Sequence, residues 1–199
     1  MNSAVIYLEA VAAVGALLAE AAQSGEPEPT AMTLATVDAR GRVSARIVLL
    51  KQFDDRGAVF YTNYDSAKAA QLAAHPQVAL CMHWKKLRDG VQVRIEGSAE
   101  RTSAAESDAY FATRARDSQI GAWASLQSQT LPAHGDLDAR IAQFEQQFAG
   151  APVPRPPHWG GYRVVPGLIE IWYGQRARLH ERVRYERVNA LWTKRLLYP

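Results

Sequence analysis

The sequence has very little cysteine. Its 199 residues include a single one, Cys81, so the chain cannot form an internal disulfide or a site built from several cysteines. The histidines, at positions 75, 83, 134, 158 and 180, show no pair at the spacing of metal ligands. We therefore expect no metal site. Cys81 lies in the apolar segment VALCMHW, which favours a buried, unreactive thiol.

Basic residues are absent before Arg40, although the early segment AVIYLEAVAAVGALLAEAA is strongly apolar. A secretory signal begins with a positively charged region, which this segment lacks. Glu9 and Glu20 interrupt it, which disfavours a membrane span. Apolar residues between Leu8 and Leu18 recur at helical spacing. The pattern predicts an amphipathic first helix and a cytoplasmic protein.

A strong charge of either sign is also absent. The chain carries 23 Lys and Arg against 20 Asp and Glu, giving a net charge of +3. With 48% hydrophobic and 22% charged residues, it has the composition of an ordinary soluble domain. A nucleic-acid binder would concentrate its basic residues on one face. The balance instead leaves room for a local pocket that binds a small anion, within a single domain spanning 1–199.

The order of strand-like and helix-like segments predicts the fold class. Turn sequences DARGR and DDRG separate the first strands, which indicates hairpins and antiparallel pairing. We predict an α+β protein in which an antiparallel sheet closes as a barrel and helices flank it. Strands are expected at 31–37, 44–53, 58–63, 78–84, 91–100, 161–166, 168–174, 183–188 and 191–199, and helices at 65–76, 102–116 and 135–150.

The segment YTNYDSAK is typical of a strand, a turn and the start of a helix. Ser66 can cap this helix, and Lys68 lies in its first turn. Free backbone amides, a hydroxyl and an ammonium at a helix N-terminus favour phosphate binding. A plain helix cap remains the alternative, although an acidic residue would suit it better than Lys68.

The segment YFATRARDSQIGAWASLQSQ gathers several more polar groups. Tyr110 and Arg114 are four positions apart and would share a helical face. A phosphate accepts hydrogen bonds from cationic and hydroxyl groups, and this segment supplies both. A solvated helix end would explain the arginines alone. In the earlier segment ARIVLLK, Arg46 and Lys51 are separated by an odd number of positions and would point to opposite faces of a strand.

Near the C-terminus, RARLHER follows the strand-like IEIWYG. If the strand continued, alternation would put Arg178, His180 and Arg182 on one face. Together with Trp172, this basic face would suit an aromatic anion. An edge strand protected by charged residues is the alternative interpretation.

Seven segments, in this order and approximate spacing, resemble the pyridoxine/pyridoxamine 5′-phosphate oxidase family of FMN enzymes: RIVLLK, FYTNYDSAK, QVRIEG, YFATRARDSQIGAWASLQS, VPRPPHWGGYRV, IEIWYG and RLHER. The resemblance runs from about Met32 to Pro199. It implies an FMN-binding split β-barrel that forms a homodimer, with two FMN molecules in clefts between the subunits. Residues 1–24 would form an N-terminal helix, 25–31 a linker, and 152–199 a segment for dimerisation and substrate covering.

The resemblance also implies the site residues. Residues that match the family's FMN-binding positions are Arg46, Ile47, Val48, Leu49, Leu50, Lys51, Tyr61, Thr62, Ser66, Lys68, Gln92, Gln127, Ser128, Trp172 and Arg182. The substrate phosphate would lie among Lys51, Tyr110, Arg114 and Ser118. Arg178 and His180 would cover the pyridine ring as the catalytic residues.

The sequence departs from the family pattern at several of these positions. Ala67 stands where the family usually has arginine, so one guanidinium near the FMN phosphate is missing. A charge-assisted hydrogen bond contributes about 1.5–3 kcal/mol, so we predict weaker FMN binding. Asp89 and Gly90 are an insertion before Gln92. Ala115 and Glu181 replace proline and aspartate and keep the neighbouring charges.

The reaction implied by the resemblance is the oxidation of pyridoxine or pyridoxamine 5′-phosphate to pyridoxal 5′-phosphate. FMN takes a hydride equivalent from the C4′ carbon and O2 reoxidises it to give H2O2, with NH3 released from the amine substrate. Two other functions stay open. One is a related split-barrel flavin oxidase of another aromatic acid, and the other is a non-catalytic carrier of flavin or pyridoxal phosphate.

Overall fold

The fold is built around one curled antiparallel sheet. The computed structural model describes residues 2–199. The strands pair in the order β2-β1-β5-β6-β7-β4-β3, and β8 and β9 extend the sheet from β7. Because β2 and β3 end this path, the barrel is split, as the resemblance implies, and not closed, as the hairpin pattern alone suggests. The strands are β1 (Ala31–Val37), β2 (Val43–Leu49), β3 (Gln52–Asp54), β4 (Gly57–Asn63), β5 (Gln77–Trp84), β6 (Val91–Arg101), β7 (Trp159–Tyr173), β8 (Glu181–Val188) and β9 (Leu191–Leu197).

Alternating side chains produce the sheet's apolar core. In β1, every second residue is buried, including Met32 and Leu34. Leu80 of β5 and Ile95 of β6 are likewise fully buried. This alternation is what the sequence patterns predict for strands with one face on the core, and the predicted α+β class is confirmed.

The strand β7 is longer than predicted. The segments expected as two strands, 161–166 and 168–174, form one strand that continues through Pro166. The pairing with β6 shifts register between Glu96 and Gly97, opposite this proline. A Cβ at Gly97 would lie 2.1 Å from the Val165 carbonyl oxygen, so glycine permits the close approach. The shift accommodates the proline's missing N–H and lets a single strand reach both ends of the sheet.

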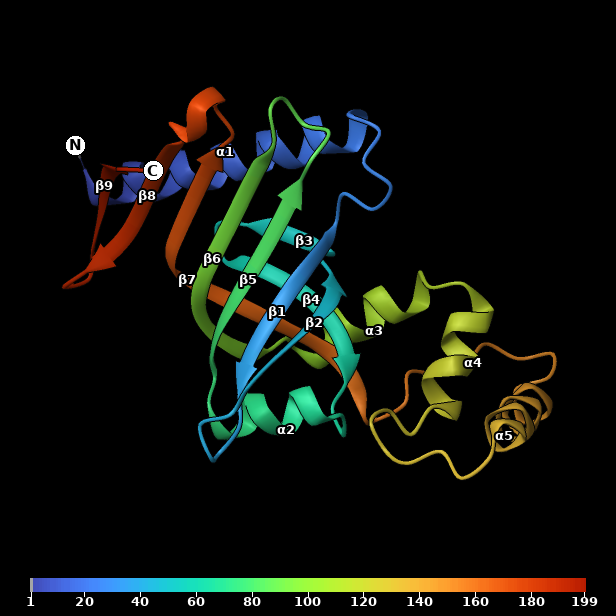
Figure 1. Ribbon diagram of the computed structural model, residues 1–199. Coiled ribbons are helices and arrows are strands. Elements are labelled where there is room, and N and C mark those ends of the chain that lie inside the picture. Colours follow the sequence, from blue (N-terminus) through green and yellow to red (C-terminus); the bar gives the residue numbers. More distant parts are fainter. Residues whose placement is uncertain (1) are drawn as a thin grey trace.

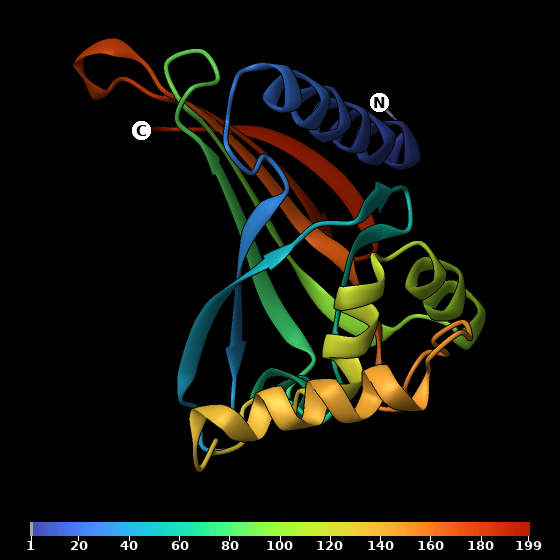
Figure 2. The same cartoon turned by 90° about the vertical axis from the view of Figure 1, so that its right-hand side faces the viewer.

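The predicted first helix is α1 (Ser3–Gln23), which crosses one end of the sheet (Figures 1 and 2). Its buried stripe includes Val14 and Leu17, and it contacts β3, β8 and β9. The Tyr7 ring stacks on Trp192 with centroids 4.7 Å apart. By length and composition alone this helix would pass as a membrane span; in the structure it packs on the sheet through one face.

The remaining helices are α2 (Ala67–Ala74), α3 (Ala104–Ala112), α4 (Arg116–Ala124) and α5 (His134–Gln147). Figure 1 shows α3, α4 and α5 grouped on one side of the sheet, with α2 at the end opposite α1. The predicted caps are present: the Ser66 hydroxyl accepts from the Ala69 N–H, and Ser103 and Glu106 form a capping box. The helix group has its own aromatic core, which includes Phe111 and Phe148.

One predicted helix is shorter than expected, and it is followed by a helix that the sequence analysis did not predict. The helix expected at 102–116 ends at Ala112, and α4 begins at Arg116. Both the backbone N–H and the hydroxyl of Thr113 donate to the Tyr110 carbonyl, which closes the last turn. The expectation that Tyr110 and Arg114 share a helical face is therefore wrong, because Arg114 lies in the connection between the helices.

Candidate functional site

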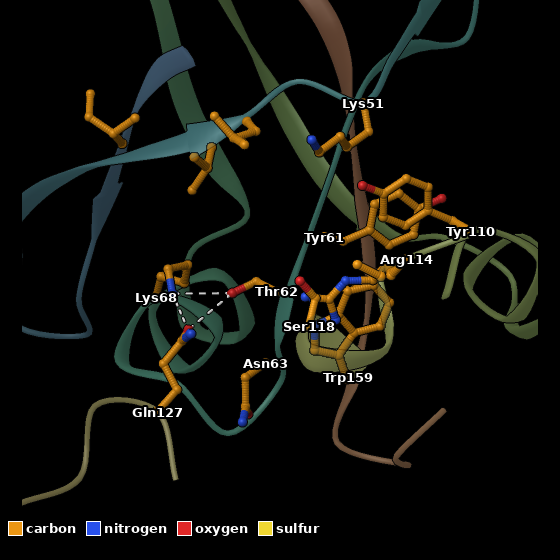
Figure 3. Close-up of a pocket in the computed structure, with 14 residues that line it drawn as sticks. Lys51, Tyr61, Thr62, Asn63, Lys68, Tyr110, Arg114, Ser118, Gln127 and Trp159 are labelled. Carbon is orange, nitrogen blue, oxygen red and sulfur yellow. Dashed lines mark hydrogen bonds between the residues drawn. The ribbon is translucent and has the colours of Figure 1, made fainter. Parts of the chain in front are cut away.

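A cavity of about 520 Å³ lies where β2 and β4 face the helix group (Figure 3). Local motifs bring most of its lining together: the end of β2, the β4–α2 turn and the α3–α4 connection. The structure places these predicted site residues around it: Ile47, Val48, Leu49, Lys51, Tyr61, Thr62, Lys68, Tyr110, Arg114, Ser118 and Gln127. Asn63, Ala115 and Trp159 also line it and were missed from the sequence.

One end of the cavity is formed by Lys68 and neutral oxygen atoms. Its ammonium donates to Gln127 Oε1 at 2.5 Å and to Thr62 Oγ1 at 3.1 Å, and it lies 3.4 Å from Ser66 Oγ. Among residues 2–199, no carboxylate oxygen lies within 4 Å of it. Burial, followed by the nearby charge of Arg46, lowers the pKa of Lys68. A half-buried ammonium without a counter-charge favours an anionic ligand.

The other end is formed by aromatic rings and Arg114. Tyr61 stacks on Tyr110 at a centroid distance of 4.0 Å and on Trp159 at 5.3 Å. The guanidinium carbon of Arg114 lies 4.7 Å from the centroid of the Trp159 ring. Burial lowers the pKa of Arg114. Its Nη1 is buried and has no hydrogen-bond partner in the described part of the chain. This orphaned donor marks a second place for an anion.

Arg46 and Leu50 lie beside the cavity and not in its lining. The Arg46 guanidinium donates to Thr36 Oγ1 at 2.5 Å, to Gln71 Oε1 at 3.0 Å and to the Leu34 carbonyl at 3.2 Å. Burial lowers the pKa of Arg46. Arg46 thus bonds within the chain, and its charge acts on Lys68. Lys51 lies beyond the end of β2 and lines the cavity, so the alternation rule does not apply to it. Leu50 is buried in the core.

The other predicted site residues lie elsewhere in this chain. Gln92 pairs in register with Trp172, which pairs in turn with Arg182 across β6, β7 and β8. The His180 ring lies 4.5 Å from that of Trp172. Neither these residues nor Arg178 line the cavity. Ser128, next to Gln127, lines a separate cavity between α4 and α5.

The RARLHER segment is not a continuous strand. Residues Arg176–Arg178 form a short 3₁₀ turn in which Ala177 and Arg178 have positive φ values of 56° and 60°. The Gln175 N–H donates to His180 Nδ1 at 3.2 Å, and β8 begins only at Glu181. The expectation that Arg178, His180 and Arg182 alternate on one strand face is therefore wrong. A tight turn breaks the period of two before it reaches Arg182.

A buried carboxylate compensates the charge of Arg182. Glu170, which is 2% exposed, lies 2.8 Å from Arg182 and 3.0 Å from Arg184, with Arg94 at 3.9 Å. Burial alone would raise the pKa of Glu170, but the hydrogen bonds from Arg182 and Arg184 outweigh it and lower the pKa. The sequence analysis overlooked Glu170, although an acid between Ile169 and Ile171 is an unusual sign in a core strand.

Asp89 and Gly90 pack against the end of β7. The Gly174 N–H donates to the Gly90 carbonyl at 2.8 Å. A Cβ at Gly174 would lie 2.0 Å from the Asp89 carbonyl oxygen, so only glycine fits there. Gln92 follows this loop and lies opposite Trp172. The loop therefore leads into a register that places Gln92 beside Trp172.

Comparisons with known proteins identify the family. Residues 18–148 match the sequence model described as pyridoxamine 5′-phosphate oxidase, and residues 159–199 match that of the pyridoxine 5′-phosphate oxidase C-terminal dimerisation region. The chain belongs to the pyridoxamine 5′-phosphate oxidase family. This membership confirms the resemblance.

Similar proteins of the pyridoxamine 5′-phosphate oxidase family cover nearly the whole chain. A pyridoxine/pyridoxamine 5′-phosphate oxidase of Xanthomonas euvesicatoria pv. vesicatoria is 59% identical over 98% of both chains. One from Myxococcus xanthus is 55% identical over 92% of this chain and 88% of its own. Among solved structures, PhzG from Burkholderia lata, in complex with tetrahydrophenazine-1-carboxylic acid, aligns with a TM-score of 0.89 and 32% identity, covering 95% of this chain and 92% of its own.

A second solved structure supports the fold alone. It is a pyridoxamine 5′-phosphate oxidase-related, FMN-binding protein from Nostoc punctiforme, which aligns with a TM-score of 0.75 at 18% identity. It covers 94% of this chain and 96% of its own. Such a match at low identity confirms the split-barrel architecture.

The family's cofactor is FMN, and the cavity fits it. Ile47, Val48 and Leu49 supply an apolar wall of the kind that a planar ring system requires. The uncompensated ammonium of Lys68, at the N-terminus of α2, suits a phosphate group. The hydroxyl and amide groups of Thr62 and Gln127 stand beside it as further hydrogen-bonding groups. The residues present therefore agree with the cofactor.

Proposed function

We propose that this protein oxidises pyridoxine 5′-phosphate and pyridoxamine 5′-phosphate to pyridoxal 5′-phosphate, using FMN and O2 and releasing H2O2, with NH3 from the amine. One observation carries the proposal: a single cavity has two partly buried cations without counter-charges, Lys68 and Arg114, besides the exposed Lys51. FMN and the substrate each bring one phosphate, so the two cations suit one phosphate each. Relatives that are 55–59% identical and bear this activity's name add support.

In this proposal the two ends of the cavity have different roles. Lys68, with Ser66, Thr62 and Gln127, binds the FMN phosphate, and residues 46–51 lie along the flavin. Tyr110, Arg114, Ser118 and Lys51 bind the substrate phosphate. FMN supplies the redox chemistry by accepting a hydride equivalent from the substrate's C4′ carbon. The protein's own contribution is to hold the two rings in one orientation while the cavity excludes water.

The residues that lie away from the cavity suggest a second protomer. Residues 159–199 match a dimerisation region, and this segment carries Trp172, Arg178, His180 and Arg182. We propose a homodimer in which the 152–199 segment of one protomer covers the cavity of the other. Trp172, Arg182 and Gln92 would then complete the FMN site, while Arg178 and His180 would close over the pyridine ring. In this division, the α1 helix and the linker that leads to β1 belong to a single, cytoplasmic domain.

The first experiment is an anaerobic titration. The purified protein is loaded with FMN, and pyridoxine 5′-phosphate is added while the visible flavin absorbance is recorded. We expect the absorbance to bleach and to return when air is admitted, with one H2O2 formed per turnover. Pyridoxamine 5′-phosphate should give the same result and release ammonia. A flavin that stays yellow with both substrates would contradict the proposal.

The likeness to PhzG suggests one alternative function, the oxidation of an aromatic acid without a phosphate. That structure holds a tricyclic aromatic acid, and its chain is 32% identical to this one. A relative of that kind would bleach with a phosphate-free aromatic acid and not with the phosphate esters. The orphaned Nη1 of Arg114 favours the phosphate esters, because a phosphate offers more acceptor oxygens than a carboxylate. A carrier would bind FMN or pyridoxal phosphate without any bleaching.

A further inference from the structure

Trp159 is a cavity residue without an assigned role. It is the first residue of β7, it is 6% exposed, and it belongs to the aromatic core of the helix group. By these facts alone it would count as a packing residue. However, its ring lines the cavity and carries the Arg114 guanidinium on one side (Figure 3).

The backbone holds this indole firmly. Trp159 pairs with Asn63 in the β4–β7 ladder, and its N–H donates to the Pro156 carbonyl at 3.1 Å. Its own carbonyl accepts from Arg155 Nη1 at 2.6 Å. Tyr61 and Tyr110 lie nearly parallel to it, with interplanar angles of 8° and 6°. The ring therefore presents a fixed face to Arg114.

The kind of group that offsets the charge of a guanidinium decides which ligands the guanidinium can still bind. Its N–H groups all point outward in its own plane, whereas an aromatic ring contacts its face. A carboxylate partner would occupy the same in-plane donors that a phosphate needs. The Trp159 ring instead offsets part of the charge from 4.7 Å below the guanidinium carbon and occupies none of these donors. The buried, unpartnered Nη1 of Arg114 is such a donor.

We propose that Trp159 is a positioning residue for the substrate phosphate: its indole face holds the Arg114 guanidinium in place with its edge free for a phosphate monoester. This inference rests on the proposed function for the identity of the ligand. It makes Trp159 a determinant of the preference for phosphorylated over unphosphorylated pyridine substrates. Trp159 acts through Arg114 and takes no part in the oxidation itself.

The test measures binding of pyridoxal 5′-phosphate, a product that does not react, to the FMN-loaded protein by calorimetry. We expect Trp159→Leu to raise its dissociation constant roughly tenfold, since a desolvated cation–π contact is lost. Trp159→Phe keeps a smaller ring and should raise it less. The dissociation constant of FMN, followed by quenching of flavin fluorescence, should stay within twofold in both variants.

A double-mutant cycle with Arg114→Ala separates positioning from packing. If Trp159 acts through Arg114, adding Trp159→Leu to Arg114→Ala should change pyridoxal 5′-phosphate binding by less than twofold. An equal effect with and without the arginine would overturn the inference, as would an unchanged dissociation constant in Trp159→Leu. If the leucine variant does not fold, Trp159→Phe carries the same cycle.

The matched control is Trp123→Phe. Trp123 packs against the same aromatic core, with its ring tilted against those of Phe144 and Phe148, and does not line the 520 Å³ cavity. It should leave pyridoxal 5′-phosphate binding unchanged, and a loss equal to that of Trp159→Phe would overturn the inference. The bleaching titration of the unmodified protein is read separately. If the flavin does not bleach but pyridoxal 5′-phosphate still binds in a way that depends on Trp159, the proposed function is overturned and this inference is supported. If the flavin does not bleach and pyridoxal 5′-phosphate does not bind, both are overturned.

Discussion

Cations at the two ends of the sheet are compensated in opposite ways. At the C-terminal end, Arg182 and Arg184 both bond to the buried carboxylate of Glu170. In the cavity, Lys68 contacts only neutral oxygen atoms, and Arg114 rests on an indole face. A carboxylate occupies the donors of an arginine, while an amide oxygen or a ring leaves charge available. The pairs with Glu170 therefore contribute to the fold, also at Arg182, which the proposed dimer places beside FMN. Cations without a carboxylate partner attract an anion.

The largest effect is expected from removing the carboxylate of Glu170 that pairs with Arg182 and Arg184. Glu170→Gln removes the charge that compensates Arg182 and Arg184, and removal of one partner from a buried ion pair costs about 3 kcal/mol or more. We expect the free energy of unfolding to fall by about that amount. Urea denaturation of the FMN-free protein measures it.

The matched control for this variant is Glu96→Gln. Glu96 pairs with Arg94 in a partly exposed position, where its side chain is 40% exposed against 2% for Glu170. An exposed pair contributes about 1 kcal/mol at most, so the control should lose far less stability. Equal losses in the two variants would mean that burial of Glu170 does not matter.

The next effect concerns Lys68, the cavity lysine without a carboxylate partner. Lys68→Met removes the ammonium that faces the cavity, and the loss of a charge-assisted bond of about 1.5–3 kcal/mol should weaken FMN binding about 10- to 100-fold. Stability of the FMN-free protein should not fall, because the burial that lowers the pKa of Lys68 opposes the charged form. Flavin fluorescence gives the affinity and urea denaturation the stability. Lys85→Met, at an exposed lysine, is the control; an FMN affinity within twofold of wild type in Lys68→Met would refute the assignment.

A pH titration sharpens the same point. The pKa of Lys68 in the FMN-free protein is lowered by burial and by Arg46. A bound phosphate stabilises the ammonium and raises that pKa again. FMN affinity is therefore highest below the lowered pKa of Lys68 and declines as the pH rises above that pKa. Fluorescence titrations between pH 7 and 10.5 should show this decline beginning below the ordinary lysine pKa of about 10.4, and Lys68→Met should abolish it.

The smallest effect comes from adding a cation. Ala67 is exposed at the first position of α2, where the resemblance predicts an arginine. Ala67→Arg should tighten FMN binding about fivefold, since an exposed ionic contact contributes about 1 kcal/mol at most. The same fluorescence assay measures it, with Ala67→Gln as the uncharged control. Equal affinities for the arginine and glutamine variants would show that the charge is not used.

Local motifs made one end of the site predictable from the sequence. The strand, turn and helix around Lys68 are adjacent in sequence, and the capping Ser66 marks where the helix begins. Trp159 was missed because an isolated tryptophan before two glycines looks like core. The glycines were the available signal: a Cβ at Gly160 would lie 2.1 Å from the Tyr64 hydroxyl, and one at Gly161 would lie 2.9 Å from the Tyr61 ring. They make room for the rings beside the indole.

Other features depend on contacts that periodicity does not encode. Alternation assumes an unbroken strand, so it could not anticipate the turn at Ala177 that separates Arg178 from Arg182. The split between α3 and α4 depends on the hydrogen bonds of Thr113. The resemblance named Gln92 and Trp172 as site residues, but no pattern within one chain says that they lie away from Lys68. That separation arises from the pairing of β6 with β7.

The single strand β7 has a further consequence, because it carries Trp159 near its start and Trp172 near its end. From position 159 to position 172, an extended backbone spans at most about 43 Å at 3.3 Å per residue. The backbone cannot lengthen, and the pairing with β6 fixes the register between the two strands. The length of β7 thus sets the distance between the cavity and the end of the sheet that carries Trp172. An insertion or deletion anywhere along β7 would misalign both at once.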